Sequence, residues 1–414
     1  MGSRYGAAPQ RQDDDYYYPE RERLARRPRK PKQSNKAAPR PKLNIHVGNI
    51  DITIYLVVTI LVLIGVIMVF SASYAMAANS RRFDNDAFFF LRRNGMFAAA
   101  GFVAMNVISR ISLDIWRKGV WILYAGSIGL LVAVIIGGEL VGGATRWLEI
   151  PVIGAFQPSE VAKAAVIFLI AHLVDKYPTA LKSWFNTFMF SGLVAAIVVL
   201  VILPGGFSSS LIIAAIGFGM IFIASPYITR FFVMGGIGVA VVAAYLGITA
   251  YLGTGFRGAR ITAWLDPWSD PLGVGFQPIQ SLYAVATGGW FGLGIGQSRQ
   301  ASFIPEPQND MIFAIIVEEL GLIGAGLILI LFAILIWRGI IVAMKAPDTF
   351  SSMVAIGIVF AFAFQTIINV GVVTNTIPNT GVTLPFISYG GTSLMVSMGL
   401  AGVLLSISKY SAIK

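Results

Sequence analysis

One junction of this sequence, PEPQNDMIFAIIVEELG (residues 305–321), places acidic side chains beside a long apolar run. Asp310 directly precedes that run, so its carboxylate is expected at a helix N-terminus, where backbone N–H groups and the helix dipole favour an anion. An exposed carboxylate there could accept a proton from a hydroxyl nucleophile. The alternative is an ordinary first-turn acid that caps its own helix. The long loop of residues 253–309 favours the catalytic interpretation, because loops of that length are usually functional.

Further acids lie within the apolar run itself. Glu318 and Glu319 are expected about 12 to 14 Å farther along the helix, at about 1.5 Å per residue. Intramembrane acids are costly and are usually paired. Lys163, the only lysine inside a predicted membrane helix, is the expected partner, and Glu160 competes for it from three residues away. We therefore predict a buried polar brace between two helices, in preference to direct catalysis.

Basic and aromatic side chains occur together in FRGARITAWLDPWSDPLGVGFQPIQS (residues 256–281). The guanidinium groups of Arg257 and Arg260 suit phosphate oxygens. The tryptophans nearby suit a membrane interface, so a lipid-linked phosphate would use both. The alternative is a structural loop with internal Arg–Asp pairs. Arg146 and Trp147 repeat the pattern elsewhere, where the aromatic face could stack on a sugar or simply anchor the loop at the interface.

The segment LPFISYGGTS (residues 384–393) places a proline and a pair of glycines at the expected start of a helix. Glycines allow close approach of backbones, and nearby hydroxyl groups such as that of Ser388 can satisfy freed backbone groups. A packing role is favoured over a chemical one. No P-loop, G-x-S-x-G, H-E-x-x-H or Gly-rich dinucleotide motif occurs in its proper context.

The composition predicts what must position these residues. Hydrophobic residues make up 56% of the 414, charged residues 12%, and the mean hydropathy is +0.74, values typical of an integral membrane protein. Because about 20 apolar residues span a bilayer and the runs are continuous, we expect helices rather than barrel strands. The predicted fold class is all-α, with ten transmembrane helices. The expected segments are residues 53–74, 94–110, 119–138, 158–174, 186–203, 208–225, 231–252, 311–337, 350–371 and 388–408.

The absence of cysteine excludes disulfides, thiolate metal sites and a cysteine nucleophile. Only His46 and His172 carry imidazoles, one in the N-terminal tail and one in a predicted membrane helix. Histidine-based zinc or base chemistry is therefore not expected.

The basic charge is concentrated at the N-terminus. Residues 1–47 contain twelve Lys or Arg against five Asp or Glu, and a Pro-rich basic run before a first helix indicates a disordered cytoplasmic tail. Contact with anionic lipid headgroups is the preferred explanation of its charge, and nucleic acid is not an expected partner. Residues 48–410 form the ten-helix domain, which includes a large extracytoplasmic loop at residues 253–309. Both termini are then cytoplasmic, and the polar motifs open to the outer face.

Four motifs together resemble the SEDS family (shape, elongation, division and sporulation) of ten-helix peptidoglycan glycosyltransferases. They are RWLEI…FQPSEVAK, RGARITAWLDPWSDPLGVGFQPIQS, PEPQNDMIFAIIVEELG and GVTLPFISYGGTS, in the family's order over nearly all of residues 50–408. Thr383, before LPFISYGG, is more similar to the cell-division branch, and the elongation branch is the second choice.

The resemblance implies polymerisation of lipid II at the outer face of the cytoplasmic membrane, at the division septum. The 4-hydroxyl of one disaccharide attacks the anomeric carbon of another, and undecaprenyl pyrophosphate leaves. The implied partners are lipid II, a class B penicillin-binding protein transpeptidase and other divisome proteins. No cofactor is implied with certainty. The alternatives are a lipid II flippase and a non-catalytic divisome scaffold.

The same resemblance assigns roles to single residues. Asp310 matches an essential aspartate and would be a general base, or a ligand of a divalent cation (Mg²⁺ or Mn²⁺) near the pyrophosphate. Arg257 and Arg260 match paired arginines that would hold the pyrophosphate, and Trp147 matches a functionally sensitive tryptophan. The remaining candidate substrate-binding residues, which lie in the same motifs, are Arg146, Gln280, Ser281 and Ser388.

Three departures from the family pattern occur. The usual HTD reads Gln308-Asn309-Asp310, so the histidine is absent. The usual QPDxG is replaced by LPGGFSSS (residues 203–210), which contains no carboxylate. Pro278 interrupts a stretch that is usually more compatible with a helix. Because Asp310 and both arginines remain, catalytic competence is still the prediction.

Overall fold

The computed structural model describes residues 48–141, 144–150, 154–227, 229–230, 232–233, 235–236 and 256–411. They all belong to one compact unit, Leu43–Lys414. The predicted basic tail of residues 1–47 and nearly all of the predicted helix of residues 231–252 lie outside the described residues.

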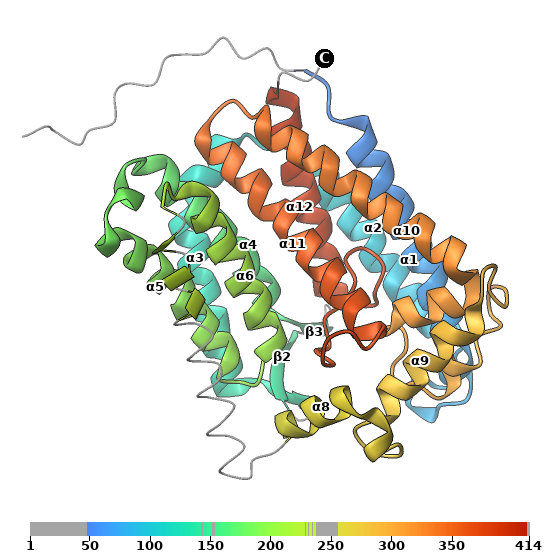
Figure 1. Cartoon of the computed structure of the whole chain (residues 1–414). Helices are drawn as coiled ribbons and strands as arrows, with labels where there is room; N and C mark the ends of the chain where they lie inside the picture. The colour runs from blue at the N-terminus through green and yellow to red at the C-terminus, as the bar shows by residue number, and fades with distance from the viewer. Residues whose placement is uncertain are drawn as a thin grey trace, which may run out of the picture. The chain divides into compact units, whose positions relative to one another are not determined.

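Helices dominate the described part of the chain (Figure 1). The other nine predicted segments each coincide with a helix, and two shorter helices, α8 and α9, lie in the segment predicted as a loop. The helices are α1 (Ile52–Ala78), α2 (Phe89–Ile108), α3 (Leu113–Gly137), α4 (Pro158–Lys176), α5 (Trp184–Ile202), α6 (Phe207–Ala224), α8 (Phe256–Leu265), α9 (Phe276–Gly288), α10 (Ile312–Met344), α11 (Thr349–Val373) and α12 (Gly391–Tyr410).

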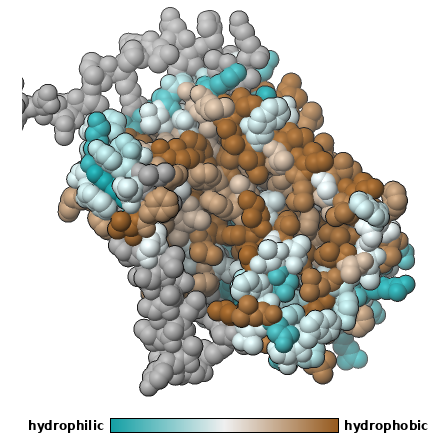
Figure 2. Space-filling model, in the orientation of Figure 1, coloured by the Kyte–Doolittle hydropathy of each residue, from teal (hydrophilic) through white to brown (hydrophobic). Residues whose placement is uncertain are grey.

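Seven described helices are long and apolar enough to cross a membrane: α1, α3, α5, α6, α10, α11 and α12. Helix α2 contains Arg92 and Arg93 near its start, and α4 contains Glu160 and Lys163, which makes both helices less apolar. Hydrophobic side chains cover most of the central part of the face in Figure 2. Many large apolar side chains, such as Ile122 at 79% exposure, point outward. Such a surface requires a lipid environment, because soluble proteins rarely expose large apolar patches.

The all-α prediction is corrected by a small antiparallel sheet between α3 and α4. Its strands are β1 (Glu139–Val141), β2 (Ala144–Ile150) and β3 (Gly154–Phe156), in the order β1-β2-β3. In the register, Leu148 pairs with Phe156 and Ile150 with Gly154. Thr, Trp and Ile residues in β2 favour strands, and strand pairing satisfies the backbone groups of a connection that is not helical.

Helix α10 changes direction at Gly321, whose φ of 70° and ψ of −177° are not helical. A Cβ atom at this position would lie 2.4 Å from the backbone nitrogen of Gly292 and 2.4 Å from the carbonyl oxygen of Trp290. Only glycine therefore allows the loop after α9 to pack directly on the α10 backbone. This contact fixes the start of the loop after α9, which continues to Asp310.

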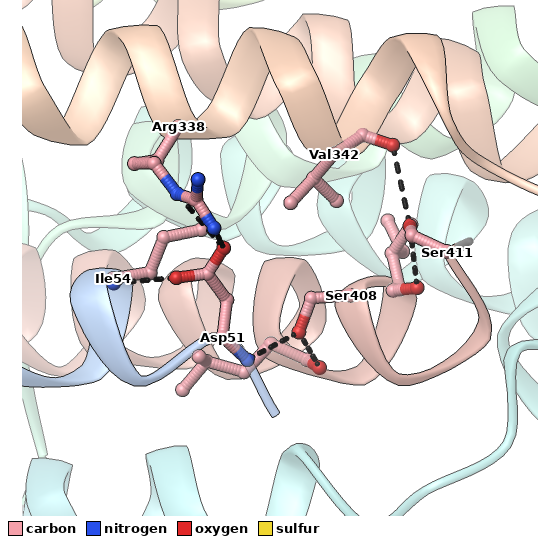
Figure 3. A network of polar contacts seen from close by, with 8 residues as sticks. Asp51, Ile54, Arg338, Val342, Ser408 and Ser411 are labelled. Carbon is pink, nitrogen blue, oxygen red and sulfur yellow. Dashed lines mark hydrogen bonds and ion pairs between the residues drawn. The ribbon is translucent and has the colours of Figure 1, made fainter. Parts of the chain in front are cut away.

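A polar network closes the opposite end of α10 (Figure 3). Asp51 caps α1 by accepting a hydrogen bond from the Ile54 backbone N–H at 3.1 Å. Arg338 of α10 donates to the same carboxylate from Nε at 3.0 Å and from Nη2 at 2.5 Å. The Asp51 backbone N–H donates to the Ser408 hydroxyl of α12 at 3.0 Å. The network therefore joins three helices that are distant in sequence.

Candidate active site

Asp310 lies in the turn just before α10. Its carboxylate is partly buried and faces Gly381, where a Cβ atom would lie 3.6 Å from Oδ2. Burial raises the pKa of Asp310 above its ordinary value. A carboxylate with a raised pKa is a stronger base than an ordinary aspartate, as general-base catalysis near neutral pH requires.

Two guanidinium groups flank this carboxylate. Arg260 of α8 donates from Nη1 to the Asn379 carbonyl at 3.3 Å, and Arg146 extends from β2. Both positive charges oppose the rise in the pKa of Asp310, with Arg260 contributing more. Burial, followed by repulsion from Arg260, lowers the pKa of Arg146. The Nε atom of Arg146 is buried without a hydrogen-bond partner among the described residues. Such a group is available to an anionic ligand.

Two further residues predicted to bind the substrate, Arg257 and Trp147, lie in α8 and in the small sheet. Arg257 lies in α8, but its side chain is outside the described part of the structure. Trp147 follows Arg146 in β2, opposite Glu139 of β1, and is partly buried. The segment of residues 253–309, predicted as an extracytoplasmic loop, contains the helices α8 (10 residues) and α9 (13 residues).

The connection between α11 and α12, residues 374–390, holds the site together. Asn375 exchanges two hydrogen bonds with Trp264 of α8, at 3.1 and 3.3 Å. The Asn379 side chain donates to Gln277 of α9 at 2.8 Å. The Tyr389 backbone N–H donates to the Gln308 carbonyl at 2.8 Å. One loop therefore contacts the arginine-bearing helix, the next helix and the segment before Asp310.

Two predicted substrate-binding hydroxyl groups are used by the fold. Ser281 is completely buried and donates to the Val373 carbonyl at 2.8 Å. The Ser388 hydroxyl is buried and accepts from the Leu384 backbone N–H at 2.7 Å. Gln280 of α9 is partly buried. The geometry gives the two serines a packing role and offers no support for their contact with a substrate.

The predicted brace between Lys163 and the acids of α10 is wrong in its pairing. Lys163 of α4 donates to Glu160 at 2.7 Å and to Gln365 of α11 at 3.1 Å. This buried cluster joins α4 to α11 instead of α10. The ammonium group is satisfied by a carboxylate and an amide, as a buried charge requires.

Glu318 and Glu319 hold a different part of the chain. Glu318 accepts from the Ser298 hydroxyl and from the Arg299 backbone N–H, at 2.5 and 3.2 Å. Glu319 accepts from the Ser71 hydroxyl of α1 at 2.6 Å and from the Ser298 backbone N–H at 3.3 Å. Both acids thus fasten to α10 the loop after α9, which leads to Asp310.

An apolar groove of about 1150 Å³ runs between α2, α3, α4 and α12. Its lining includes Arg93 at one end of α2 and Ile108 at the other, which are about 22 Å apart at about 1.5 Å per residue. Glu149 and Gly154 of the sheet line the same end as Arg93, beside Arg92. An apolar channel of this length with basic side chains at one end suits a long-chain lipid that carries an acidic headgroup.

Tyr389 connects the arginine end of the groove to Asp310. Its ring makes an edge-to-face contact with Phe90 of α2, with centroids 5.0 Å apart. Burial raises the pKa of Tyr389, which the charge of Arg93 opposes and that of Glu306 reinforces. Glu306 also raises the pKa of Asp310, so its charge acts on both Tyr389 and the Asp310 carboxylate.

A divalent cation would have few protein ligands at the described site. No group of three His, Cys, Asp or Glu side chains converges among the described residues. The guanidinium charges of Arg146 and Arg260 act on Asp310, and two fixed positive charges oppose a third. A cation near Asp310 would therefore need phosphate oxygens of a bound substrate among its ligands.

Sequence reasoning missed Tyr389, Arg93 and Asn369. Asn369 was visible as an amide within an otherwise apolar run, and Arg93 as a basic residue at the start of a membrane helix. Tyr389 offered no signal apart from its place in the SYGG motif.

The fold and the site define a multi-pass membrane protein that has a carboxylate under the charges of two arginines and a lipid-sized groove. Residues 51–413 match the family model of the FtsW, RodA and SpoVE cell cycle proteins. The chain belongs to this family, and the family resemblance of its motifs is confirmed.

Curated relatives match over most of the chain. Stage V sporulation protein E of Bacillus subtilis (strain 168) is 42% identical over 367 residues, which cover 87% of this chain and 97% of that protein. The probable peptidoglycan glycosyltransferase FtsW of Geobacter sp. (strain M18) is 37% identical over 362 residues, with 86% and 96% covered.

Two solved structures share the fold. One, described as the structural coordination of polymerization and crosslinking by a peptidoglycan synthase complex, has a TM-score of 0.70 at 23% identity, covering 88% of this chain and 99% of that one. The rod shape determining protein RodA of Thermus thermophilus has a TM-score of 0.64 at 21% identity, covering 88% and 98%.

Proposed function

We propose that this protein is a peptidoglycan glycosyltransferase that polymerises lipid II into glycan strands. The observations that carry the proposal are the Asp310 carboxylate under the charges of Arg146 and Arg260 and a groove with Arg92 and Arg93 in its lining that is long enough for a polyprenyl chain. The printed name of the Geobacter relative, probable peptidoglycan glycosyltransferase FtsW, supports the same reaction.

In the proposed reaction, the groove holds the polyprenyl chain of the donor. Arg93 at its mouth and Arg260 beside Asp310 hold the donor pyrophosphate, because arginine forks match phosphate oxygens. Asp310 removes the proton from the 4-hydroxyl of the acceptor GlcNAc as its oxygen attacks the anomeric carbon of the donor MurNAc. The bond from that carbon to the pyrophosphate oxygen breaks, and undecaprenyl pyrophosphate leaves with the bonding electrons.

Each side chain then has a separate task. The raised pKa of Asp310 strengthens it as a base, whereas the arginines stabilise charge that develops on the leaving group. Trp147, next to Arg146 in β2, supplies an aromatic face for a sugar ring. Arg257 is proposed as a further pyrophosphate ligand on the same helix as Arg260.

The proposed arrangement in the cell follows from the charge distribution and the family. Ten membrane helices would place the basic tail and the C-terminus in the cytoplasm, with Asp310 at the outer face. The protein would act at the division septum with a class B penicillin-binding protein transpeptidase and other divisome proteins. The solved peptidoglycan synthase complex of similar fold supports a partner of this kind.

The test is polymerisation of labelled lipid II by the purified protein, alone and with a class B penicillin-binding protein whose own polymerising activity is absent. We expect glycan strands from the wild type and none from Asp310→Ala. Equal strands from both would remove Asp310 from the mechanism. If neither forms strands, lipid II movement in proteoliposomes would identify the flippase, and no movement would leave the scaffold.

A further inference from the structure

Asn369 of α11 is a completely buried amide one turn before the end of its helix. Its Nδ2 group donates to the Asp310 carbonyl at 2.7 Å and to the Val382 carbonyl at 2.8 Å. Both hydrogens of the amide are therefore used, and they join two segments that are distant in sequence. The carbonyls belong to the turn before α10 and to the loop of residues 374–390.

The amide oxygen of Asn369 indicates that the side chain acts through the two hydrogen bonds that it donates. Oδ1 of Asn369 is buried and has no hydrogen-bond partner among the described residues. An unpaired buried acceptor costs free energy. The two hydrogen bonds donated by the amide offset that cost. The two donated bonds are its only described polar contacts.

These bonds tie the carboxylate to the arginine through one loop. Val382 is held by Asn369, Gly381 faces the Asp310 carboxylate, and Asn379 accepts the hydrogen bond of Arg260. Asn379, Gly381 and Val382 therefore bring Arg260, the Asp310 carboxylate and Asn369 to one short stretch of the loop. A shift of this loop would change the separation of Asp310 and Arg260.

We propose that Asn369 is a positioning residue that sets the distance between Asp310 and Arg260 by clamping the Asp310 turn to loop 374–390. The inference rests on the proposed glycosyltransferase function. Asn369 touches neither substrate nor the reacting atoms, and it acts through the backbone of Asp310.

Two replacements separate the donated bonds from side-chain volume. Asn369→Asp keeps the shape but replaces the donor by an oxygen that faces two carbonyl oxygens. Asn369→Leu keeps the approximate volume and removes all polarity. Thr366→Val is the matched control, because this buried hydroxyl on the same helix bonds only to the Phe362 carbonyl one turn earlier, at 2.8 Å.

The first measurement is lipid II polymerisation by the full-length variants with the transpeptidase partner. We expect both Asn369 variants to lower kcat by about 10- to 100-fold, the effect of a small misplacement of a catalytic group, with KM changed by less than about twofold. Thr366→Val should retain the wild-type values. A kcat within twofold of wild type in folded Asn369 variants would overturn the proposal, as would a loss confined to KM.

The second measurement does not depend on activity. Since the chain has no cysteine, the exposed Ser302 and Thr376 can be changed to cysteine and spin-labelled on either side of the clamp. We expect a broader label-to-label distance distribution with Asn369→Leu than with wild type or Thr366→Val. An unchanged distribution would overturn the clamp even if a variant were inactive. An inactive wild type with the expected broadening would contradict the glycosyltransferase proposal alone.

Discussion

Two aspartates, Asp51 and Asp310, occupy similar places at opposite ends of the bundle and are treated in opposite ways. Each directly precedes a long membrane helix. Asp51 accepts three hydrogen bonds, one from the α1 backbone and two from Arg338 (Figure 3). No hydrogen bond from another described residue reaches the Asp310 carboxylate, although Arg146 and Arg260 act on it through space.

The difference agrees with the proposed division between a structural carboxylate, Asp51, and a catalytic one, Asp310. A buried carboxylate whose acceptor positions are all filled is stable and has no free oxygen lone pair for another proton donor. The Asp310 carboxylate accepts fewer hydrogen bonds than that of Asp51, which costs free energy. The structure around it offsets this cost, because Asn369, Gly381 and the loop of residues 374–390 fix its backbone. The carboxylate itself remains available to a proton donor.

The largest expected effect that tests this contrast is on catalysis. Asp310→Asn should lower lipid II polymerisation by about 10²- to 10⁴-fold, the usual contribution of a general base. Asp51→Asn should leave the rate per folded molecule within about threefold of wild type, because Asp51 lies at the opposite end of the bundle from Asp310 and its bonds are structural. Strand length and yield on gels measure both. Similar losses in the two variants would remove the distinction between the aspartates.

The arginines provide the next largest effect. Arg260→Ala should lower kcat/KM by about 10- to 100-fold, from about 1.5 to 3 kcal/mol for a charge-assisted hydrogen bond. Arg260→Lys should recover only part, since a lysine cannot form a bidentate fork. Arg338→Ala is the matched control at the other end of the bundle. Its kcat/KM per folded molecule should be close to wild type, and an equal loss there would contradict pyrophosphate binding by Arg260.

The sequence predicted where the helices lie better than which side chains meet. Runs of about 20 apolar residues determine membrane helices almost alone, and nine of ten expected segments coincide with described helices. The depth of a residue along a helix does not specify which way its side chain faces. Lys163 was therefore paired with the acids of α10, but it contacts Gln365 of α11. The strands of residues 139–156 were missed because they are short and depend on pairing.

For the site, the sequence indicated residue types and left their partners open. Asp310 was predicted because a carboxylate at the junction of a long loop and an apolar helix is unusual, and Arg260 because of its motif. The hydroxyl groups of Ser281 and Ser388 bond to backbone groups, and such a hydroxyl looks the same in sequence as one that faces a substrate. Asn369 donates hydrogen bonds to residues that lie 59 and 13 positions away in the sequence. No local sequence pattern reveals such contacts.

A smaller effect concerns stability at the Asp51 end. Asp51→Asn should lower the free energy of unfolding by about 1 to 3 kcal/mol, less than for a fully buried pair because the Arg338 side chain is 24% exposed. Asp51→Asn combined with Arg338→Met should be less destabilised than the sum of the single changes, since no unpaired charge remains. Thermal unfolding in detergent measures all three variants. Strict additivity would show that the pair contributes nothing.

The smallest effect has the opposite sign. Burial raises the pKa of Asp310, so the folded state binds its proton more tightly than the unfolded state does. The associated stability is present below the ordinary carboxyl pKa of about 3.9 and is lost as pH rises through the higher folded pKa. Asp310→Asn has no such loss, so near neutral pH its unfolding midpoint should exceed that of wild type, by at most about 3 °C.

Asp51→Asn at the same pH should instead lower the unfolding midpoint, so the two variants shift it in opposite directions. The advantage of Asp310→Asn should shrink as the pH is lowered toward about 3.9, where both proteins carry a neutral group at position 310. Unfolding scans across this pH range, with the Asp310→Asn and wild-type proteins in one detergent, measure the difference. A variant less stable than wild type at neutral pH would mean that the ionised Asp310 stabilises the fold, as Asp51 does, and would place it among the structural carboxylates.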